Sequence, residues 1–139
     1  MGAHILCVDD DQLIGRLVHD VLEQEGFKVS LATSGKQGLE IAHASPPDLI
    51  LLDIMMPGMN GFEVCQALRQ DAQLYKIPVV MLTAMESSKL NEDAFAAGAE
   101  LCMTKPFRPD RLVNAMNVAL QNAALKYGKG VKKPKAPGS

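Results

Sequence analysis

The stretch that decides the fold reads Leu49-Ile50-Leu51-Leu52-Asp53-Ile54-Met55-Met56-Pro57-Gly58. Four aliphatic residues run without interruption to the carboxylate of Asp53, and prolines and a glycine bound the run on both sides. So short an apolar run is typical of a strand that is buried on both faces of a parallel sheet. Asp53 therefore ends a buried strand, where an ionised carboxylate needs a cation or a hydrogen-bond donor beside it.

The rest of the chain alternates apolar runs with helical patterns. We expect further strands at 4–8, 27–32, 77–82 and 101–104, of which 27–32 is the least apolar and therefore lies at an edge. Helices are expected between them, with apolar stripes over 13–22, 39–44, 62–68, 88–97 and 112–120. Since parallel neighbours need long, right-handed crossovers, this alternation predicts an α/β fold in which helices cover both faces of a parallel sheet.

Length and charge limit the functional classes. With 139 residues and 47% hydrophobic residues, the chain is long enough for one domain, which we place at 3–127. The segment 128–139 has four lysines and no acid, and we expect it to be a disordered basic tail or linker. The remainder then carries a net charge of about −6, which argues against direct nucleic-acid binding. We find no secretion signal or membrane-spanning run, so we expect a cytoplasmic protein without membrane contact.

The sulfur-containing residues are interpreted as packing groups. Three widely spaced cysteines in apolar surroundings indicate reduced buried thiols and no zinc site: Cys7, Cys65 and Cys102. Four methionines near the predicted strand ends are expected to fill gaps in the core: Met55, Met56, Met59 and Met85.

Polar side chains follow the predicted strands at the point where each ends. Asp9 and Asp10 follow the first strand, Asp53 the third, Thr83 the fourth and Lys105 the fifth. The carboxyl ends of parallel strands meet at one edge of the sheet, where α/β proteins bind their ligands. Three carboxylates brought together repel one another, so either one stays protonated or a divalent cation joins them. Oxygen ligands suit Mg²⁺, with Mn²⁺ as the alternative. A metal, an amine and a hydroxyl around one carboxylate are the groups that phosphoryl transfer requires, and Asp53 is placed to be the nucleophile.

The chain resembles the receiver (CheY-like) domain of the two-component response regulators. The motifs that carry the resemblance are Val8-Asp9-Asp10, residues 51–61, Leu82-Thr83-Ala84, residues 97–99 and Lys105-Pro106-Phe107. Each is weak alone, but their order and spacing over about residues 4–125 are highly specific. The resemblance implies a flavodoxin-like, doubly wound sheet with the strand order 2-1-3-4-5.

The resemblance also implies the roles of the residues. Asp53 would be the phosphoacceptor, and Mg²⁺ would be bound by Asp10, by Asp9 mainly through water, by Asp53 and by the backbone carbonyl of Met55. A histidine kinase or a histidine phosphotransfer protein would donate the phosphoryl group. The chain would be a signalling phosphoacceptor rather than an enzyme with a separate substrate, and its output partner is not specified by the sequence.

Three further positions take their roles from the family. Lys105 would contact the acceptor and then the phosphoryl group. The peptide bond between Lys105 and Pro106 is expected to be cis. Thr83 would move toward a phosphoryl oxygen, and Ala84 would leave room for that group. A homodimer through the face made by the helix 88–97, the strand 101–104 and the last helix is compatible with the family, but nothing in this sequence supports it.

The sequence departs from the family at several positions. Cys102 stands where an aromatic residue is usual, so we hypothesise that the signal passes through the loop after Thr83 instead. Met55 and Met85 lie two residues after the acceptor and the threonine, and neither can hold an attacking water strongly. We therefore expect slow self-dephosphorylation. Arg108 replaces a capping residue before the last helix.

Two other interpretations remain open from the sequence. Asp9 and Asp11 also resemble the Asp-x-Asp start of haloacid-dehalogenase-like phosphatases, with Asp9 as nucleophile and Asp11 as acid. Against this, no acidic pair follows Lys105, and the loop after Asp53 would be unexplained. A pseudo-receiver that serves only for docking is the second alternative, which the complete set of acids argues against.

Overall fold

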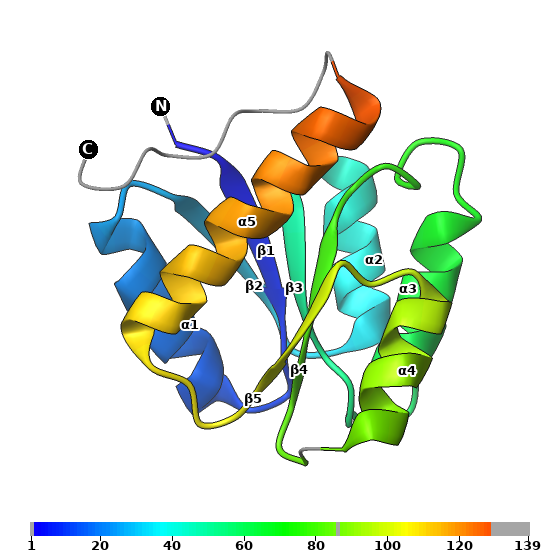
Figure 1. Ribbon diagram of the computed structural model, residues 1–139, viewed down its shortest axis with the longest axis horizontal. Helices are drawn as coiled ribbons and strands as arrows, with labels where there is room; N and C mark the ends of the chain where they lie inside the picture. The colour runs from blue at the N-terminus through cyan, green and yellow to red at the C-terminus, as the bar shows by residue number, and fades with distance from the viewer. Residues whose placement is uncertain (1, 86, 129–139) are drawn as a thin grey trace.

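The computed structural model describes residues 2–85 and 87–128. In this range five parallel strands form one sheet in the order β2-β1-β3-β4-β5, and five helices alternate with them (Figure 1). The strands are β1 (His4–Val8), β2 (Lys28–Ala32), β3 (Leu49–Asp53), β4 (Val79–Thr83) and β5 (Leu101–Thr104). The helices are α1 (Gln12–Gln24), α2 (Gly35–Ala44), α3 (Gly61–Arg69), α4 (Ser88–Ala97) and α5 (Pro109–Tyr127). The predicted α/β class, the strand order and the edge position of the second strand are confirmed.

Two apolar cores lie on the two faces of the sheet. One joins alternate residues of β1 and β3, such as Leu6 and Leu52, to α2, α3 and α4. The other joins Ile5 and Leu51 to α1 and α5, so two helices cover one face and three cover the other (Figure 1). All five residues of β3 are buried, as expected for a strand enclosed on both faces.

Two strands begin later than predicted. The fourth was expected from Ile77, but β4 begins at Val79 because Pro78 has no amide hydrogen to give to the ladder. Pro78 contributes its carbonyl, which accepts from the Ile50 amide at 3.0 Å, while the Ile77 amide donates to Leu74 in a turn. The second strand was expected from Phe27, whose amide instead donates to the Leu22 carbonyl at the end of α1.

The apolar stripe of α1 is wider than the face that it buries. Val18 and Leu22 are fully buried against β1, whereas Leu13 is 80% exposed and Leu17 is 42% exposed. Leu13 and Leu17 lie one residue before the positions that face the core, and this rotates them toward solvent.

The ends of the helices are set by local sequence. Serine before a helical stripe is a typical N-cap, so the sequence predicts Ser34 as the cap of α2. Its side chain does cap the helix, accepting from the Gln37 amide at 3.1 Å. Asn60 and Glu63 form a capping box at the start of α3. Arg108 precedes α5 without a side-chain cap, in agreement with the sequence, and Pro109 occupies the first turn instead.

Arg69, the last residue of α3, joins three segments. Its guanidinium donates to the Gly98 carbonyl at 2.8 and 3.1 Å, to the Ile77 carbonyl at 2.7 Å and to the Tyr75 carbonyl at 3.0 Å. Gly98 ends α4 with φ of 106°, so Arg69 satisfies a carbonyl at the carboxyl end of that helix.

None of the helices within residues 2–85 and 87–128 combines the length and the apolar character that crossing a bilayer requires. Of the predicted tail 128–139, the structure describes only Gly128, whose amide donates to the Ala124 carbonyl at the end of α5. Residues 129–139 lie outside the described residues, so the prediction for the tail stays a prediction.

Candidate functional site

The strand register brings the predicted site residues to one edge of the sheet. Asp53 pairs with Leu82 and Thr83 pairs with Thr104, so Thr83 is the last residue of β4 and Lys105 directly follows β5. Val8 pairs with Leu52, which places the following residues, Asp9 and Asp53, next to each other. After β1 the chain forms β2 on one side of it and then crosses to form β3 on the other side. The strand order therefore reverses at β1, and this edge contains the switch point of the sheet.

Three carboxylates converge at that edge. Asp9, Asp10 and Asp53 each offer an oxygen atom, and these atoms lie within 4.8 Å of one another. Asp9 is 2% exposed and Asp53 is 3% exposed, while Asp10 lies at the surface. Oxygen donors that approach from a buried and an exposed side fit a hard divalent cation that keeps several waters. The structure therefore supports a candidate Mg²⁺ site built from these acids.

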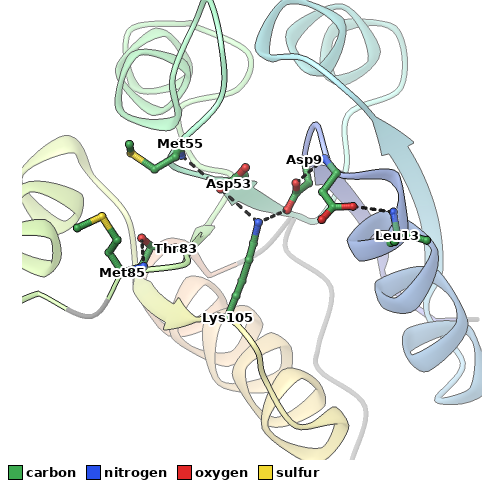
Figure 2. Close-up of polar contacts among 8 residues, drawn as sticks. Asp9, Leu13, Asp53, Met55, Thr83, Met85 and Lys105 are labelled. Carbon is green, nitrogen blue, oxygen red and sulfur yellow. Dashed lines mark hydrogen bonds and ion pairs between the residues drawn. The ribbon is translucent and has the colours of Figure 1, made fainter.

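Lys105 supplies the positive charge of the cluster. Its ammonium lies 2.8 Å from Asp9 Oδ2 and 3.5 Å from Asp53 Oδ1 (Figure 2). The sequence predicted contact with the acceptor, and the closer pairing with Asp9 is a further finding. The peptide bond between Lys105 and Pro106 is cis, as predicted. Three carboxylates and one ammonium leave two negative charges, which is the charge that a divalent cation balances.

The cluster changes the acidity of its members. Burial and the negative charge of Asp9 raise the pKa of Asp53 to about 6, although Lys105 and the Met55 amide act in the opposite direction. Burial alone would lower the pKa of Lys105, but the hydrogen bond and charge of Asp9, together with Asp53, raise it. At neutral pH Asp53 is therefore largely ionised, and the lysine stays charged.

The loops after β3 and β4 hold the remaining polar contacts. The Met55 amide donates to Asp53 Oδ1 at 3.3 Å, and the Met85 amide donates to Thr83 Oγ1 at 3.1 Å (Figure 2). Thr83 is 1% exposed, so its hydroxyl is held in the buried wall of the site. The adjacent Ala84 is exposed and adds little bulk.

Gly61 brings the start of α3 against the backbone of Asp53. A Cβ atom on Gly61 would lie 2.5 Å from the Asp53 carbonyl oxygen and 2.8 Å from the Ile54 Cα. The Gly61 amide donates to the Ile54 carbonyl at 2.9 Å, which closes the intervening loop. The sequence predicted that a helix begins at Gly61, but it did not predict this close approach to Asp53. A glycine at the first helical position was the signal for this close approach.

Two methionine predictions were wrong. Met55 is 60% exposed and Met85 is 58% exposed, so neither fills a gap in the core. Both lie in the loops that follow β3 and β4, on the Thr83 side of Asp53 (Figure 2). Met56 is buried and Met59 half-buried, both packed in the core on the α2, α3 and α4 face, as expected for packing residues.

Asp11 does not join the acidic cluster. Its side chain caps α1 and accepts from the Leu13 amide at 2.9 Å, while its own amide donates to Asp9 Oδ1 at 2.9 Å. Asp9 in turn is paired with Lys105. The phosphatase interpretation requires a free Asp9 nucleophile and Asp11 as its acid, and this arrangement provides neither.

Cys102 lies away from the acids, on the open edge of the sheet. It is half-buried and lines a groove of about 630 Å³ along β5 and α5, with Phe107, Arg108 and Arg111 among the other residues of the lining. All three cysteines are free thiols, and Cys7 and Cys65 are buried as predicted. The predicted burial of Cys102 was wrong, because it lies on the edge strand β5, where it is only half-buried.

Comparison with known proteins identifies the class to which this fold and site belong. The family model of the response regulator receiver domain matches residues 5–117. The chain belongs to this family, whose members are signalling phosphoacceptors of two-component systems.

Its relatives include regulators that are longer than the chain. It is 40% identical over 117 residues to the DNA-binding dual master transcriptional regulator RpaA of Synechocystis, covering 84% of this chain and 48% of that protein. It is 39% identical over 121 residues to the DNA-binding response regulator MtrA of Mycobacterium tuberculosis, covering 87% and 52%. The chain thus spans about half the length of these curated relatives.

A solved structure of similar size matches nearly from end to end. The chemotaxis protein CheY4 of Vibrio cholerae superposes with a TM-score of 0.81 at 33% identity, covering 86% of this chain and 99% of that one. NtrX of Brucella abortus gives a TM-score of 0.84 at 31% identity, covering 91% of this chain and 28% of that protein. The family and the fold therefore agree with the resemblance seen in the sequence.

Proposed function

We propose that Asp53 accepts a phosphoryl group from a phosphohistidine of a histidine kinase or a histidine phosphotransfer protein. The observation that carries the proposal is the convergence of Asp9, Asp10 and Asp53 within 4.8 Å beside the ammonium of Lys105. Asp53 is the member of the cluster that ends the central strand, and like Asp9 it contacts Lys105 and accepts from a backbone amide.

Asp9, Asp10, Asp53 and the Met55 carbonyl would hold Mg²⁺. When bound, the cation neutralises oxygen charge on the phosphoryl group as it moves between donor and acceptor. The four donors are hard oxygen atoms, and the net charge of the side chains, two negative, is matched to a divalent ion.

The chain's own residues would perform the transfer. An ionised oxygen of Asp53 attacks phosphorus, the bond from phosphorus to the donor imidazole nitrogen breaks, and an acyl phosphate forms. Lys105 is near enough to move its charge from the Asp53 carboxylate to the new phosphoryl oxygens. The Thr83 hydroxyl would donate to one of those oxygens, and the small side chain of Ala84 would leave space for them.

The acyl phosphate would be long-lived. Met55 and Met85 flank the acceptor with apolar side chains that cannot orient an attacking water by a strong hydrogen bond. We infer slow self-dephosphorylation, over many minutes or longer. The receiver domain would extend over 3–127, with 128–139 as a tail or linker.

Intact mass spectrometry tests the proposal. The chain is incubated with acetyl phosphate and Mg²⁺, in parallel with the variant Asp53→Asn and with the same mixture after chelation of the metal. We expect the parent alone, in the presence of Mg²⁺, to gain the mass of one phosphoryl group. Equal labelling of Asp53→Asn, or labelling of the parent that survives chelation unchanged, would refute the assignment.

A further inference from the structure

Two thioethers are exposed beside the proposed acceptor. Met55 and Met85 are 60% and 58% exposed, and the other methionines in the described part of the chain are buried or half-buried. Each is tied to a site residue through its backbone amide, Met55 to Asp53 and Met85 to Thr83. In Figure 2 both side chains lie on the Thr83 side of Asp53, away from Asp9. The acceptor itself is only 3% exposed, and the loops that carry these two side chains follow Asp53 and Thr83 directly.

The thiols of the chain compete poorly for an oxidant. Cys7 and Cys65 are 1% and 0% exposed. Cys102 is half-buried, and burial raises the pKa of its thiol, which leaves little thiolate at neutral pH. A thioether reacts through a sulfur lone pair and needs no deprotonation, so exposure decides which methionines react.

We propose that Met55 and Met85 form a redox modification site at which a peroxide shortens the lifetime of the phosphoryl group on Asp53. The inference rests on the proposed function of Asp53. In the modification step, a thioether lone pair attacks one peroxide oxygen, the O–O bond breaks, and an S–O bond forms. Sulfur loses two electrons, and the second peroxide oxygen leaves as water after taking up its protons. The product is methionine sulfoxide, which cellular reductases convert back.

Oxidation changes how the side chains of Met55 and Met85 interact with water. A thioether is a weak hydrogen-bond acceptor and excludes water, whereas a sulfoxide oxygen is a strong acceptor on the same flexible side chain. It can hold a water molecule beside the acyl phosphate, where the parent side chain holds none firmly. One added hydrogen bond that orients the attacking water corresponds to about two- to tenfold faster loss of the phosphoryl group.

Peptide mapping tests the site independently of phosphorylation. The full chain is treated with a limiting dose of hydrogen peroxide, quenched with free methionine and digested. We expect Met55 and Met85 to gain oxygen before Met81 and Met116, which are both 0% exposed and serve as internal controls. Oxidation of Met81 and Met116 at the same rate would overturn the proposal.

The lifetime of the phosphoryl group tests the regulatory effect. Each protein is phosphorylated with acetyl phosphate after peroxide treatment, the donor is removed, and loss of the label is followed by intact mass against its own untreated sample. We expect acceleration in the parent, no acceleration in the double variant Met55→Leu/Met85→Leu, and reversal by methionine sulfoxide reductases. Met59→Leu changes a half-buried methionine of the same loop and should keep the acceleration.

Unchanged lifetimes in a parent with both methionines oxidised would overturn the inference, as would equal acceleration in the double variant. If the untreated parent takes up no phosphoryl group, the proposed function of Asp53 fails and the regulatory effect fails with it. The oxidation map then still decides whether these two thioethers are the reactive ones, so the two failures are distinguished.

Discussion

Replacing Asp53 by asparagine removes a carboxylate that the folded protein holds at an energetic cost. Burial and the charge of Asp9 raise its pKa from the ordinary value of 3.8 to about 6. The folded state therefore binds a proton more tightly than the unfolded chain. The contribution of Asp53 to stability is most favourable below pH 3.8 and is lost as the pH rises toward 6 and beyond.

The size of the effect follows from the two pKa values. A difference of about two pKa units corresponds to about 3 kcal/mol at pH 7, and we expect Asp53→Asn to stabilise the protein by about 1–3 kcal/mol there. At pH 4.5 the carboxyl of Asp53 is protonated in the folded state and partly protonated in the unfolded state. The stability gained by Asp53→Asn then falls to about one third of its value at pH 7.

Urea unfolding with a chelator present, at pH 7 and at pH 4.5, measures both differences. Asp20→Asn is the matched control, because Asp20 is an exposed acid paired only with surface groups and its loss should change stability by less than about 0.5 kcal/mol. If Asp53→Asn were less stable than the parent at pH 7, or if its advantage grew toward pH 4.5, the carboxylate would not be strained by its surroundings and the reasoning would be wrong.

Three other perturbations address the same edge of the sheet. Lys105→Met leaves the buried Asp9 without its cation and should cost about 3 kcal/mol in urea unfolding, against less than about 0.5 kcal/mol for the exposed Lys89→Met. Gly61→Ala forces a Cβ against the Asp53 backbone, so it should lower the free energy of unfolding by about 1–3 kcal/mol and slow labelling by acetyl phosphate. Gly58 has a φ of 75° and open space around it, so Gly58→Ala should lower the free energy of unfolding without slowing the labelling. Added Mg²⁺ should raise the melting temperature of the parent, with about 1.4 kcal/mol gained per tenfold concentration above its Kd, and Asp10→Asn should show a much flatter response.

The sequence predicted best what neighbouring residues decide. The apolar run of β3 and the Ser34 cap are local patterns, and the structure has them at the expected positions. The edge location of the polar residues also followed, because parallel strands all present their carboxyl ends on one side.

Features that depend on packing between distant segments were not predictable. The exposure of Leu13 depends on how far α1 is rotated against the sheet, and that of Met55 and Met85 on the space that two loops leave open. The pairing of Lys105 with Asp9, closer than with Asp53, is set by distances between β1 and β5 that no spacing in the chain encodes.

Arg69 has a mechanical consequence for α4. Four hydrogen bonds join its guanidinium to the carbonyls of Gly98, Ile77 and Tyr75, so the carboxyl end of that helix is anchored to the same body as α3 and the approach to β4. The amino end carries only its own cap among the described contacts: the Leu90 amide donates to Ser87 Oγ at 3.4 Å and the Asn91 amide donates to the Ser87 carbonyl at 3.1 Å. With its carboxyl end held at Gly98 in this way, α4 is expected to tilt about that end if the segment after Thr83 shifts, so that its amino end would move furthest.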